Sequence, residues 1–540
     1  MPPASTPDHS AAVTTSTRRE APGVLIPGMT LGELMIVMCS LLLGTLLAAL
    51  DLSIVATSLP TIAGKLNGFS GYAWVSTAYI LASTIAMPIM GKLSDLYGRQ
   101  KMFHINILIF LVASVLCALS QNMGHLIAAR TLQGIGGGGI QAITFAILGD
   151  LIAPRERGRY IGIYVAAHTL AAISGPLVGG FIVDRFAWQW VFLINLPLGV
   201  VAIAASMLKL RLPFQRRSVR LDFKGALLLS LALGCVMFGL EEGRKAWGRP
   251  HVGGLFAACA VLTALFIAQE RRAEEPIIPL ALFRNGIASN IFMQSVLIGS
   301  IAFGAGNVFL PLFFQDARGV SPTRSGLYLI PMMLGSLIGT TVVGRLIART
   351  GRYRMVPIVC AVFSALGIAF IARINPTLPY SQLIIPLFGM GFGTGSIFTT
   401  SSVALQNSVE RRDLGVATAT MTFFRSLGGS IGLALFGTLF SATVATEVNR
   451  RLTSPTKVSK LIRDPKAIAA LDAPTKRAVV EGLALGIRAV YLVMIPVVAV
   501  LFVIALFLRE IPLASAASLT PATSGAEPEA ATAQRTRRHR

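Results

Sequence analysis

The sequence predicts an all-α polytopic membrane protein, in which two parallel six-helix bundles and two extra helices give fourteen membrane-spanning helices. Three observations predict this fold class. Of the 540 residues, 54% are hydrophobic and only 13% are charged, whereas a soluble domain carries roughly a quarter charged residues. The apolar residues come in runs of about 20, and each run is long enough to cross a ~30 Å hydrocarbon core. Finally, a short loop motif occurs once in each half of the chain.

The apolar runs define the expected spans, and their even number places both ends of the chain on one side of the membrane. Lys and Arg gather in the short loops on that side, which the positive-inside rule assigns to the cytoplasm. One such loop contains Lys209, Arg211, Arg216, Arg217, Arg220 and Lys224. The fourteen spans are predicted to start near Leu34, Tyr72, Met102, His125, Tyr160, Gln189, Phe223, Gly253, Gly286, Gly326, Met355, Gln382, Leu414 and Gly486.

The chain is expected to divide into five parts. Both ends are rich in small and polar residues and are predicted to be disordered cytoplasmic tails. One long basic external loop, 441–485, is expected inside the second bundle. The parts are a tail over 1–33, a six-helix bundle over 34–208, a basic linker with the two extra helices over 209–285, a second bundle over 286–508, and a tail over 509–540.

Several function classes are disfavoured by the sequence. The net charge of +23 does not indicate a nucleic-acid partner, because the cations lie between apolar runs and no groove-reading motif accompanies them. The five cysteines lack metal-ligand spacing, and no P-loop motif for ATP is present. The run from Gly134 to Gly139 formally matches a dinucleotide-binding pattern, but it lies inside an apolar helix rather than after a strand. We therefore expect no metal, no cofactor and no nucleic acid.

An internal repeat sets the expected architecture. The link after the second span reads Gly91-Lys-Leu-Ser-Asp95-Leu-Tyr-Gly98-Arg99-Gln-Lys101, and the link after the tenth reads Gly344-Arg-Leu-Ile-Ala348-Arg-Thr-Gly351-Arg352-Tyr-Arg354. Gly, Leu, Gly, Arg and a final cation recur at one offset. If each link follows the second helix of a bundle, six helices precede the extra pair and six follow it. Two such bundles around a midplane site are typical of a large class of transporters.

Further motifs lie in the same order along the first half. They are Leu50-Asp51-Leu-Ser53 in span 1, Arg130-Thr-Leu-Gln133-Gly134 in span 4, Gly175-Pro176-Leu-Val-Gly179-Gly180 in span 5, and Trp188-Gln189-Trp190 through Asn195-Leu-Pro197 in span 6. Together with the Asp95 loop, they resemble the major facilitator superfamily and, within it, the fourteen-span drug:proton antiporter family, over about Gly44 to Phe507. Three residues depart from the family pattern and leave the cargo open: Ala56, Gln189 and Ala348.

Asp51 and Arg130 are the candidate proton-coupling residues. Asp51 lies deep in span 1, where a carboxylate is expensive and must face a cavity or a partner. Arg130 in span 4 is the candidate partner. The resemblance implies that Asp51 takes up and releases the proton and that Arg130 modulates this exchange. The alternative is a static ion pair that holds the two helices together.

The Asp95 loop is the candidate cytoplasmic gate. Asp95 and Arg99 are four residues apart and can pair on a helix, Lys101 supplies the final cation, and Gly91 and Gly98 permit close approach or a positive φ. The resemblance implies that this loop latches the outward-facing state, with Asp95 near the positive end of another helix. The alternative is a tight turn with solvated charges.

The span 5 motif consists of Gly175, Pro176, Gly179 and Gly180. Proline and glycine pairs bend helices, and small residues let helices pack closely. The resemblance associates this motif with exporters. Packing alone is the other interpretation. The remaining candidates are polar residues that could line a cavity: Gln133, Gln294, Asn307 and Arg425.

We therefore expect a proton-coupled exporter of amphipathic small molecules, such as drugs, dyes or antibiotics, that works by alternating access in the cell membrane. The expected partners are the small molecule, protons, the lipid bilayer and, through the loop 441–485, a periplasmic component. The first alternative is the same mechanism with a dedicated lipid, siderophore or biosynthetic product as cargo. A membrane-embedded transferase is the remote alternative, because no catalytic His or paired carboxylates stand out near an interface. No enzymatic activity is expected.

Overall fold

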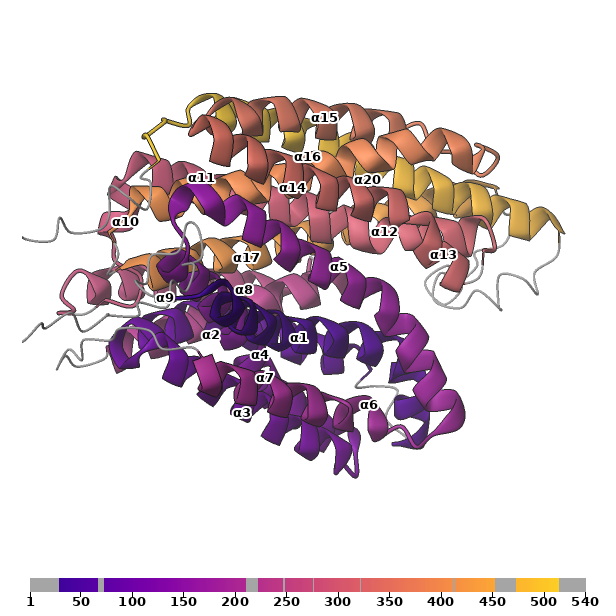
Figure 1. The fold of residues 1–540 in the computed structure, drawn as a ribbon. Coiled ribbons are helices and arrows are strands. Elements are labelled where there is room, and N and C mark those ends of the chain that lie inside the picture. The colour runs from indigo at the N-terminus through magenta and orange to yellow at the C-terminus, as the bar shows by residue number, and fades with distance from the viewer. Residues whose placement is uncertain are drawn as a thin grey trace, which may run out of the picture.

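The computed structural model describes residues 29–66, 72–209, 222–245, 248–274, 276–320, 322–410, 413–451 and 473–513. Over these ranges the chain is helical and contains no β-strand. Figure 1 shows the helices of the first half, in indigo to magenta, beside those of the second half, in orange to yellow. The first half comprises α1 (Leu31–Lys65), α2 (Tyr72–Tyr97), α3 (Arg99–Ala118), α4 (Met123–Leu151), α5 (Pro154–Arg185), α6 (Trp190–Leu193) and α7 (Asn195–Lys209).

A helix pair and a short turn of helix separate the two halves: α8 (Phe223–Lys245), α9 (Pro250–Glu270) and α10 (Ala281–Arg284). The second half begins with the segment predicted as the ninth span, which alternates between α- and π-helical geometry. This segment consists of α11 (Gly286–Gly299), π-helical η2 (Ser300–Gly306), α12 (Asn307–Leu312) and π-helical η3 (Phe313–Ala317). The remaining helices are α13 (Pro322–Tyr328), α14 (Ile330–Thr350), α15 (Met355–Ile371), α16 (Tyr380–Ser408), α17 (Leu414–Arg451) and α20 (Ala473–Leu506).

The lengths and hydropathies of these helices are those of a polytopic membrane protein. In the described part of the chain, eleven helices are long and apolar enough to cross a membrane, and two shorter apolar helices cover Gly286–Ala302 and Met355–Ile371. Helix α5 is also a candidate span, because after its charged first turns the sequence from Ile161 to Val183 contains no Asp, Glu, Lys or Arg and is long enough to cross a hydrocarbon core. Twelve of the predicted starts lie within four residues of an observed helix start, whereas Tyr160 lies six residues after the start of α5 and Gly486 thirteen after the start of α20. The all-α membrane fold is confirmed, and the total of fourteen spans stays a prediction.

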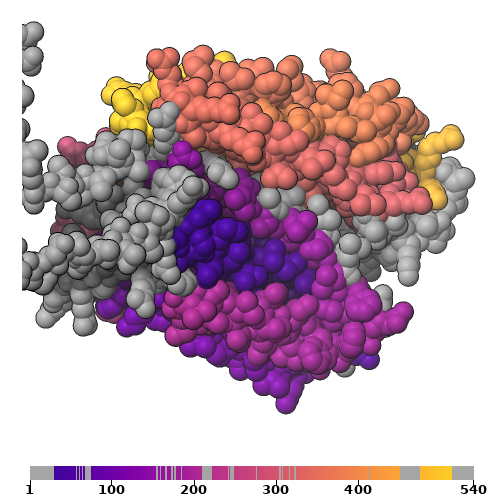
Figure 2. Space-filling view, viewed as in Figure 1, coloured from indigo at the N-terminus to yellow at the C-terminus, as the bar shows by residue number. Residues whose placement is uncertain are grey.

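The helices of the two halves pack in equivalent pairs. In the first half α4 packs against α2 and α3, and in the second half α16 packs in the same way against α14 and α15. The halves meet chiefly between α5 and α14 and between α2 and α17, and α4 also packs against α17 and α5 against α16. Helix α8 packs against α9, α17 and α2. On the face shown in Figure 2, each half forms a contiguous mass and the two meet along one boundary. These pairings fit the repeat predicted from the two loop motifs.

The loop expected over 441–485 is wrong at both ends. Helix α17 continues to Arg451, and α20 begins at Ala473 rather than near Gly486. The cause is a buried apolar stripe in which Val444 and Val448 of α17 pack in one core cluster with Val479 and Leu483 of α20. Because these extensions are too polar overall to read as membrane spans, hydropathy alone misses them. The segment proposed to meet a periplasmic component is thereby reduced to 452–472, which lies outside the described residues.

Parts of the predicted tails are also ordered. The Thr30 hydroxyl accepts a hydrogen bond from the Glu33 amide at 3.3 Å, and Glu33 accepts one from the Thr30 amide at 3.1 Å. This reciprocal capping box starts α1 inside the expected tail 1–33. At the other end, the Ile511 amide donates to the Tyr353 hydroxyl at 3.0 Å, and the Tyr353 amide donates to Glu510 at 2.9 Å. The outer parts of both tails, 1–28 and 514–540, lie outside the described residues.

The glycine run in α4 is a packing surface. A Cβ on Gly138 would lie 2.3 Å from the Ser83 carbonyl oxygen of α2, and one on Gly136 would lie 2.7 Å from the Asn106 carbonyl oxygen of α3. Backbone atoms at these distances cannot move aside as a flexible side chain can. The run therefore lets α4 approach two helices at once, as small residues do in membrane helix packing.

Gly138→Val is expected to destabilise the protein by at least about 1–3 kcal/mol, because it forces α4 away from α2. Gly234→Val in α8 is the matched control, since nothing lies within 4 Å of a Cβ there. Thermal unfolding of the two purified variants measures the difference. Equal midpoints for both would contradict the packing role of this glycine face.

Candidate functional site

A fully buried ion pair connects α1 and α4. Asp51 and Arg130 are each 0% exposed, and Nη1 of Arg130 donates a hydrogen bond to Oδ2 of Asp51. Two opposite charges taken out of water need close pairing and additional hydrogen bonds to be tolerated. The structure thus brings together the two residues predicted to couple transport to protons. A static ion pair that holds α1 and α4 together would have the same contacts.

Two amides complete the hydrogen bonding of the Asp51 carboxylate. Oδ1 of Asp51 accepts from Nε2 of Gln133 at 2.8 Å and from Nδ2 of Asn195 at 2.8 Å. Both amides also donate to the Ser114 hydroxyl oxygen, at 2.8 and 3.2 Å. Helices α1, α3, α4 and α7 therefore meet at one carboxylate. Three donors on one carboxylate suit its ionised form, which only accepts hydrogen bonds.

Asn195 and Ser114 were not among the predicted site residues. Asn195 lies 144 positions from its partner Asp51 along the chain, so no local spacing connects them. The available signal was an amide within the apolar stretch Ile194-Asn195-Leu-Pro197, because a polar side chain in a span marks a functional or packing contact. Gln133, predicted as a cavity residue, instead belongs to this cluster.

Arg130 has further partners on α2. Its Nε donates to the Val75 carbonyl oxygen at 3.4 Å, and its guanidinium carbon lies 4.3 Å from the centroid of the Tyr79 ring. Its Nη1 also donates to Oε1 of Gln133 at 2.7 Å. Nη2 is buried and makes no hydrogen bond to any part of the chain that is described. The guanidinium therefore has a donor to spare if the arrangement around it changes.

A second charged cluster lies at the ends of α2, α4 and α17. Oδ2 of Asp95 accepts a hydrogen bond from the Val416 amide at 2.9 Å, in the first turn of α17. Nη1 of Arg99 lies 3.1 Å from Oδ1 of Asp95, and its Nε pairs with Asp150 at the end of α4. A carboxylate at a helix N-terminus is stabilised by the helix dipole. The predicted partner of Asp95, a positive helix end, is thus the start of α17.

Glycines make this contact possible. A Cβ on Gly91 would lie 2.3 Å from the Ala419 Cβ, and one on Gly415 would lie 2.1 Å from Oδ1 of Asp95. Gly98 has a φ of 96°, in the region that favours glycine. Gly415 was missed because it lies far from the loop in sequence. Lys101, the last residue of the motif, is exposed on α3 and outside this cluster.

The span 5 motif packs against α1. A Cβ on Gly175 would lie 1.9 Å from the Ser53 hydroxyl oxygen, and the Gly179 carbonyl oxygen accepts a hydrogen bond from the Ser58 hydroxyl at 3.4 Å. Nothing lies within 4 Å of a Cβ on Gly180. Helix α5 continues through Pro176, whose side chain lies outside what the structure describes. The motif thus brings α5 close to the helix that carries Asp51.

The other cavity candidates differ from one another. Gln294 is buried and donates to Oδ1 of Asn290 at 2.6 Å, while Asn290 donates to the Ile504 carbonyl oxygen at 2.7 Å, so both serve contacts between α11 and α20. Asn307 opens α12, and its side chain is outside the described set. Oε1 of Gln294 is buried and has no hydrogen-bond partner among the described residues, and a cargo-binding role for Gln294 stays a prediction.

Arg425 lies between the two halves. Its guanidinium carbon is 4.3 Å from the centroid of the Phe398 ring of α16, and it interacts electrostatically with Tyr164 and His168 of α5. Phe145 of α4 joins this aromatic group, 4.4 Å from the Tyr164 ring and 5.6 Å from the Phe398 ring. Among the described side chains no carboxylate pairs with Arg425. It is therefore the one cavity candidate placed at the bundle interface with its charge available.

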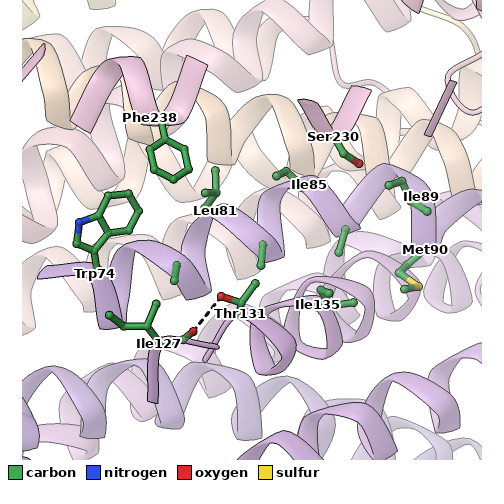
Figure 3. Close-up of a pocket in the computed structure, with 13 residues that line it drawn as sticks. Trp74, Leu81, Ile85, Ile89, Met90, Ile127, Thr131, Ile135, Ser230 and Phe238 are labelled. Carbon is green, nitrogen blue, oxygen red and sulfur yellow. Dashed lines mark hydrogen bonds between the residues drawn. The ribbon is translucent and has the colours of Figure 1, made fainter. Parts of the chain in front are cut away.

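Two apolar cavities flank α8. The first, about 570 Å³, lies between α2, α4 and α8. Figure 3 shows Leu81 and Ile85 on α2 facing toward Phe238 and Ser230 of α8, with the Trp74 and Phe238 rings at one end. The second, about 760 Å³, lies between α8, α9, α17 and the link 271–284. In the described ranges, no cluster of three His, Cys, Asp or Glu side chains could hold a metal ion.

Known proteins share this sequence and this fold. Residues 41–433 match the Major Facilitator Superfamily. The chain is 36% identical over 415 residues to multidrug resistance protein 3 of Bacillus subtilis (strain 168), which covers 76% of this chain and 81% of that protein. It is 33% identical over 434 residues to the Acurin A biosynthesis cluster MFS-type transporter of Aspergillus aculeatus, covering 77% and 76% of the two chains.

Among solved structures, that of the human organic anion transporter MFSD10 (TETRAN) matches with a TM-score of 0.60 at 15% sequence identity, over 87% of this chain and 99% of that one. This likeness concerns the fold alone. The predicted resemblance is confirmed by the family match and by the relatives. The chain belongs to the major facilitator superfamily and is a polytopic membrane transporter.

Proposed function

We propose that the protein exports amphipathic small molecules in exchange for protons, by alternating access in the cell membrane, with both ends of the chain in the cytoplasm. The observation that carries the proposal is the buried pair of Asp51 and Arg130, held by Gln133 and Asn195. Relatives named for multidrug resistance and multidrug transport support the direction and the type of cargo.

The proton step follows from the cost of buried charge. With Asp51 ionised, the ion pair has no net charge and both carboxylate oxygens accept hydrogen bonds. When the carboxylate takes up a proton, Arg130 loses its counter-charge. The packing of α1, α3, α4 and α7 around the pair then loses its main electrostatic stabilisation. The protein then moves to a state in which Arg130 gains new partners. One proton crossing 100 mV supplies about 2.3 kcal/mol, enough for roughly a 50-fold gradient of a neutral compound.

The gate proposed from the Asp95 loop is the cluster that joins α2 to α17. Asp95 binds the start of α17 while Arg99 pairs with both Asp95 and Asp150. Because α2 and α17 belong to different bundles, this contact holds the cytoplasmic ends of the bundles together. Its release would open the protein to the cytoplasm, where cargo is collected.

The cargo is inferred from the interior. Arg425 at the bundle interface and the apolar cavity between α2, α4 and α8 suit compounds with a large apolar body and a polar group. A dedicated biosynthetic product is the second candidate cargo, favoured by the relative named for the acurin A biosynthesis cluster. Both cargoes use the same transport mechanism. The membrane-embedded transferase has no support from family or relatives.

The proposal is tested with purified protein in liposomes that carry a pH gradient and an internal pH dye. Adding an amphipathic compound, for example a rhodamine dye, is expected to release protons from the acidic compartment while the compound accumulates there. A proton ionophore should abolish the accumulation, and liposomes without protein serve as the control. Compound movement with no proton movement would contradict proton coupling while leaving transport in place. Proton release with no accumulation of any compound would contradict antiport.

A further inference from the structure

The larger apolar cavity has one charged end. Its body is lined by apolar side chains of three helices, among them Leu233 of α8, Phe266 of α9 and Leu427 of α17. Arg271 and Arg284 line the same cavity. The cavity thus combines an apolar body of about 760 Å³ with two cations, which is the chemistry of a site for an anionic amphiphile.

The two arginines lie just beyond the ends of apolar helical segments, Pro250–Glu270 and Gly286–Ala302, that are candidates to lie in the membrane. Arg271 directly follows Glu270, the last residue of α9, and Arg284 ends α10, two residues before α11 begins. Both are exposed, and neither forms an ion pair with a described acidic side chain. A cargo site at the bilayer midplane would place its cations deep within the helices instead. Their depth matches that of lipid headgroups.

The link between the arginines is fixed by Glu270. This buried carboxylate accepts hydrogen bonds from the Ile277 and Ile278 amides, at 3.1 and 3.3 Å. These hydrogen bonds fold the chain after α9 back against the end of that helix. As a result, Arg284 lines the same cavity as Arg271. Because Glu270 is committed to these amides, it leaves the two guanidinium groups available for an anion.

Helix α9 is mostly exposed along its length, and Val261 and Leu265 are 60% and 51% exposed. In a membrane, this surface faces lipid. The cavity beside it is therefore adjacent to the bilayer, and the hydrocarbon chain of a lipid can enter without crossing water.

We propose that this cavity binds an anionic phospholipid of the surrounding bilayer, with its phosphate on Arg271 and Arg284 and an acyl chain along α8, α9 and α17. This inference goes beyond the proposed export function and does not depend on it. The bound lipid fills the space between the extra helices and α17, the helix whose first turn binds Asp95. It therefore attaches the extra pair to the second bundle.

The test uses the full-length protein in detergent, with phosphatidylglycerol and phosphatidylcholine of identical acyl chains as probes. Native mass spectrometry is expected to show retained phosphatidylglycerol and little phosphatidylcholine, and phosphatidylglycerol should raise the unfolding temperature. The double variant Arg271→Gln/Arg284→Gln is expected to weaken phosphatidylglycerol binding about 30-fold, given the contribution of each cation near an anionic headgroup. Arg272→Gln is the matched control, since Arg272 is exposed beside Arg271 but does not line the cavity.

A second variant tests the acyl chain. Leu427→Trp narrows the cavity and leaves both arginines in place, so it should also weaken phosphatidylglycerol binding. The conservative variant Arg271→Lys/Arg284→Lys should keep most of the binding and shows whether the protein tolerates changes there. Equal binding of the two lipids, or equal loss in Arg272→Gln, would overturn the proposal. So would displacement of phosphatidylglycerol by a rhodamine dye that the protein exports, because the cavity would then hold cargo.

Discussion

Asp51→Asn is expected to abolish proton-driven accumulation of exported compounds while the protein stays folded. Asn has the shape of Asp, and its one oxygen can still accept hydrogen bonds from Gln133 and Asn195, while its amide nitrogen replaces the oxygen that Arg130 binds. The substitution therefore mimics the protonated carboxylate, with Arg130 lacking its counter-charge. Asn cannot, however, bind and release a proton at this position. One proton crossing 100 mV is worth about 2.3 kcal/mol. The ratio of the compound's concentrations on the two sides of the membrane should therefore fall by roughly 50-fold, to the value found without a proton gradient.

The measurement compares uphill and downhill movement of the same dye in proteoliposomes. Downhill movement should persist in Asp51→Asn, which shows that the variant is folded and can alternate. Asp222→Asn is the matched control. Asp222 caps the start of α8, where it accepts a hydrogen bond from the Gly225 amide at 2.9 Å, and it belongs to neither the Asp51 cluster nor the Asp95 cluster. Uphill accumulation that survives in Asp51→Asn would place the proton site elsewhere.

Asp95→Asn is expected to shift the protein toward states open to the cytoplasm. The substitution removes the negative charge that Asp95 of α2 places beside the first turn of α17. Such a charge at a helix N-terminus is worth up to about 2 kcal/mol in partly buried geometry. It also leaves Arg99 with Asp150 as its only ionised partner in the cluster. A change of about 2 kcal/mol alters the ratio of closed to open states about 30-fold.

Spin labels on the two bundles report this shift. Lys101→Cys on α3 and Met355→Cys on α15 are both exposed and occupy equivalent helices in the two halves. With the five native cysteines replaced, double electron–electron resonance should show a longer distance population in Asp95→Asn. The Asp222→Asn control should keep the distribution of the unsubstituted protein. Identical distributions for all three would mean that the Asp95 cluster does not hold the bundles together.

The sequence was sufficient for whatever depends on local pattern. Runs of apolar residues located the helix starts, and the depth of Asp51 and Arg130 in their spans predicted the buried pair. Contacts between segments that are far apart in the chain could not be predicted from the sequence. Asp95 and its partner Val416 are 321 positions apart, and Asn195 meets Asp51 only because α7 packs on α1. The extensions of α17 and α20 were missed for another reason, since their stability comes from packing against each other rather than from hydropathy.

Gly98 and Gly351, at the same position of the two loop motifs, have φ angles of 96° and 67°. The backbone bend has thus been kept in both copies, whereas the acidic side chain is present in one and replaced by Ala348 in the other. The two seams between the bundles are consequently unequal: the one at α2 and α17 contains an electrostatic clasp, and the one at α5 and α14 has no carboxylate at the matching position. A nearly symmetrical scaffold is therefore held unequally on its two sides. The seam at α2 and α17 is the one at which a single change of charge can alter how firmly the bundles are joined.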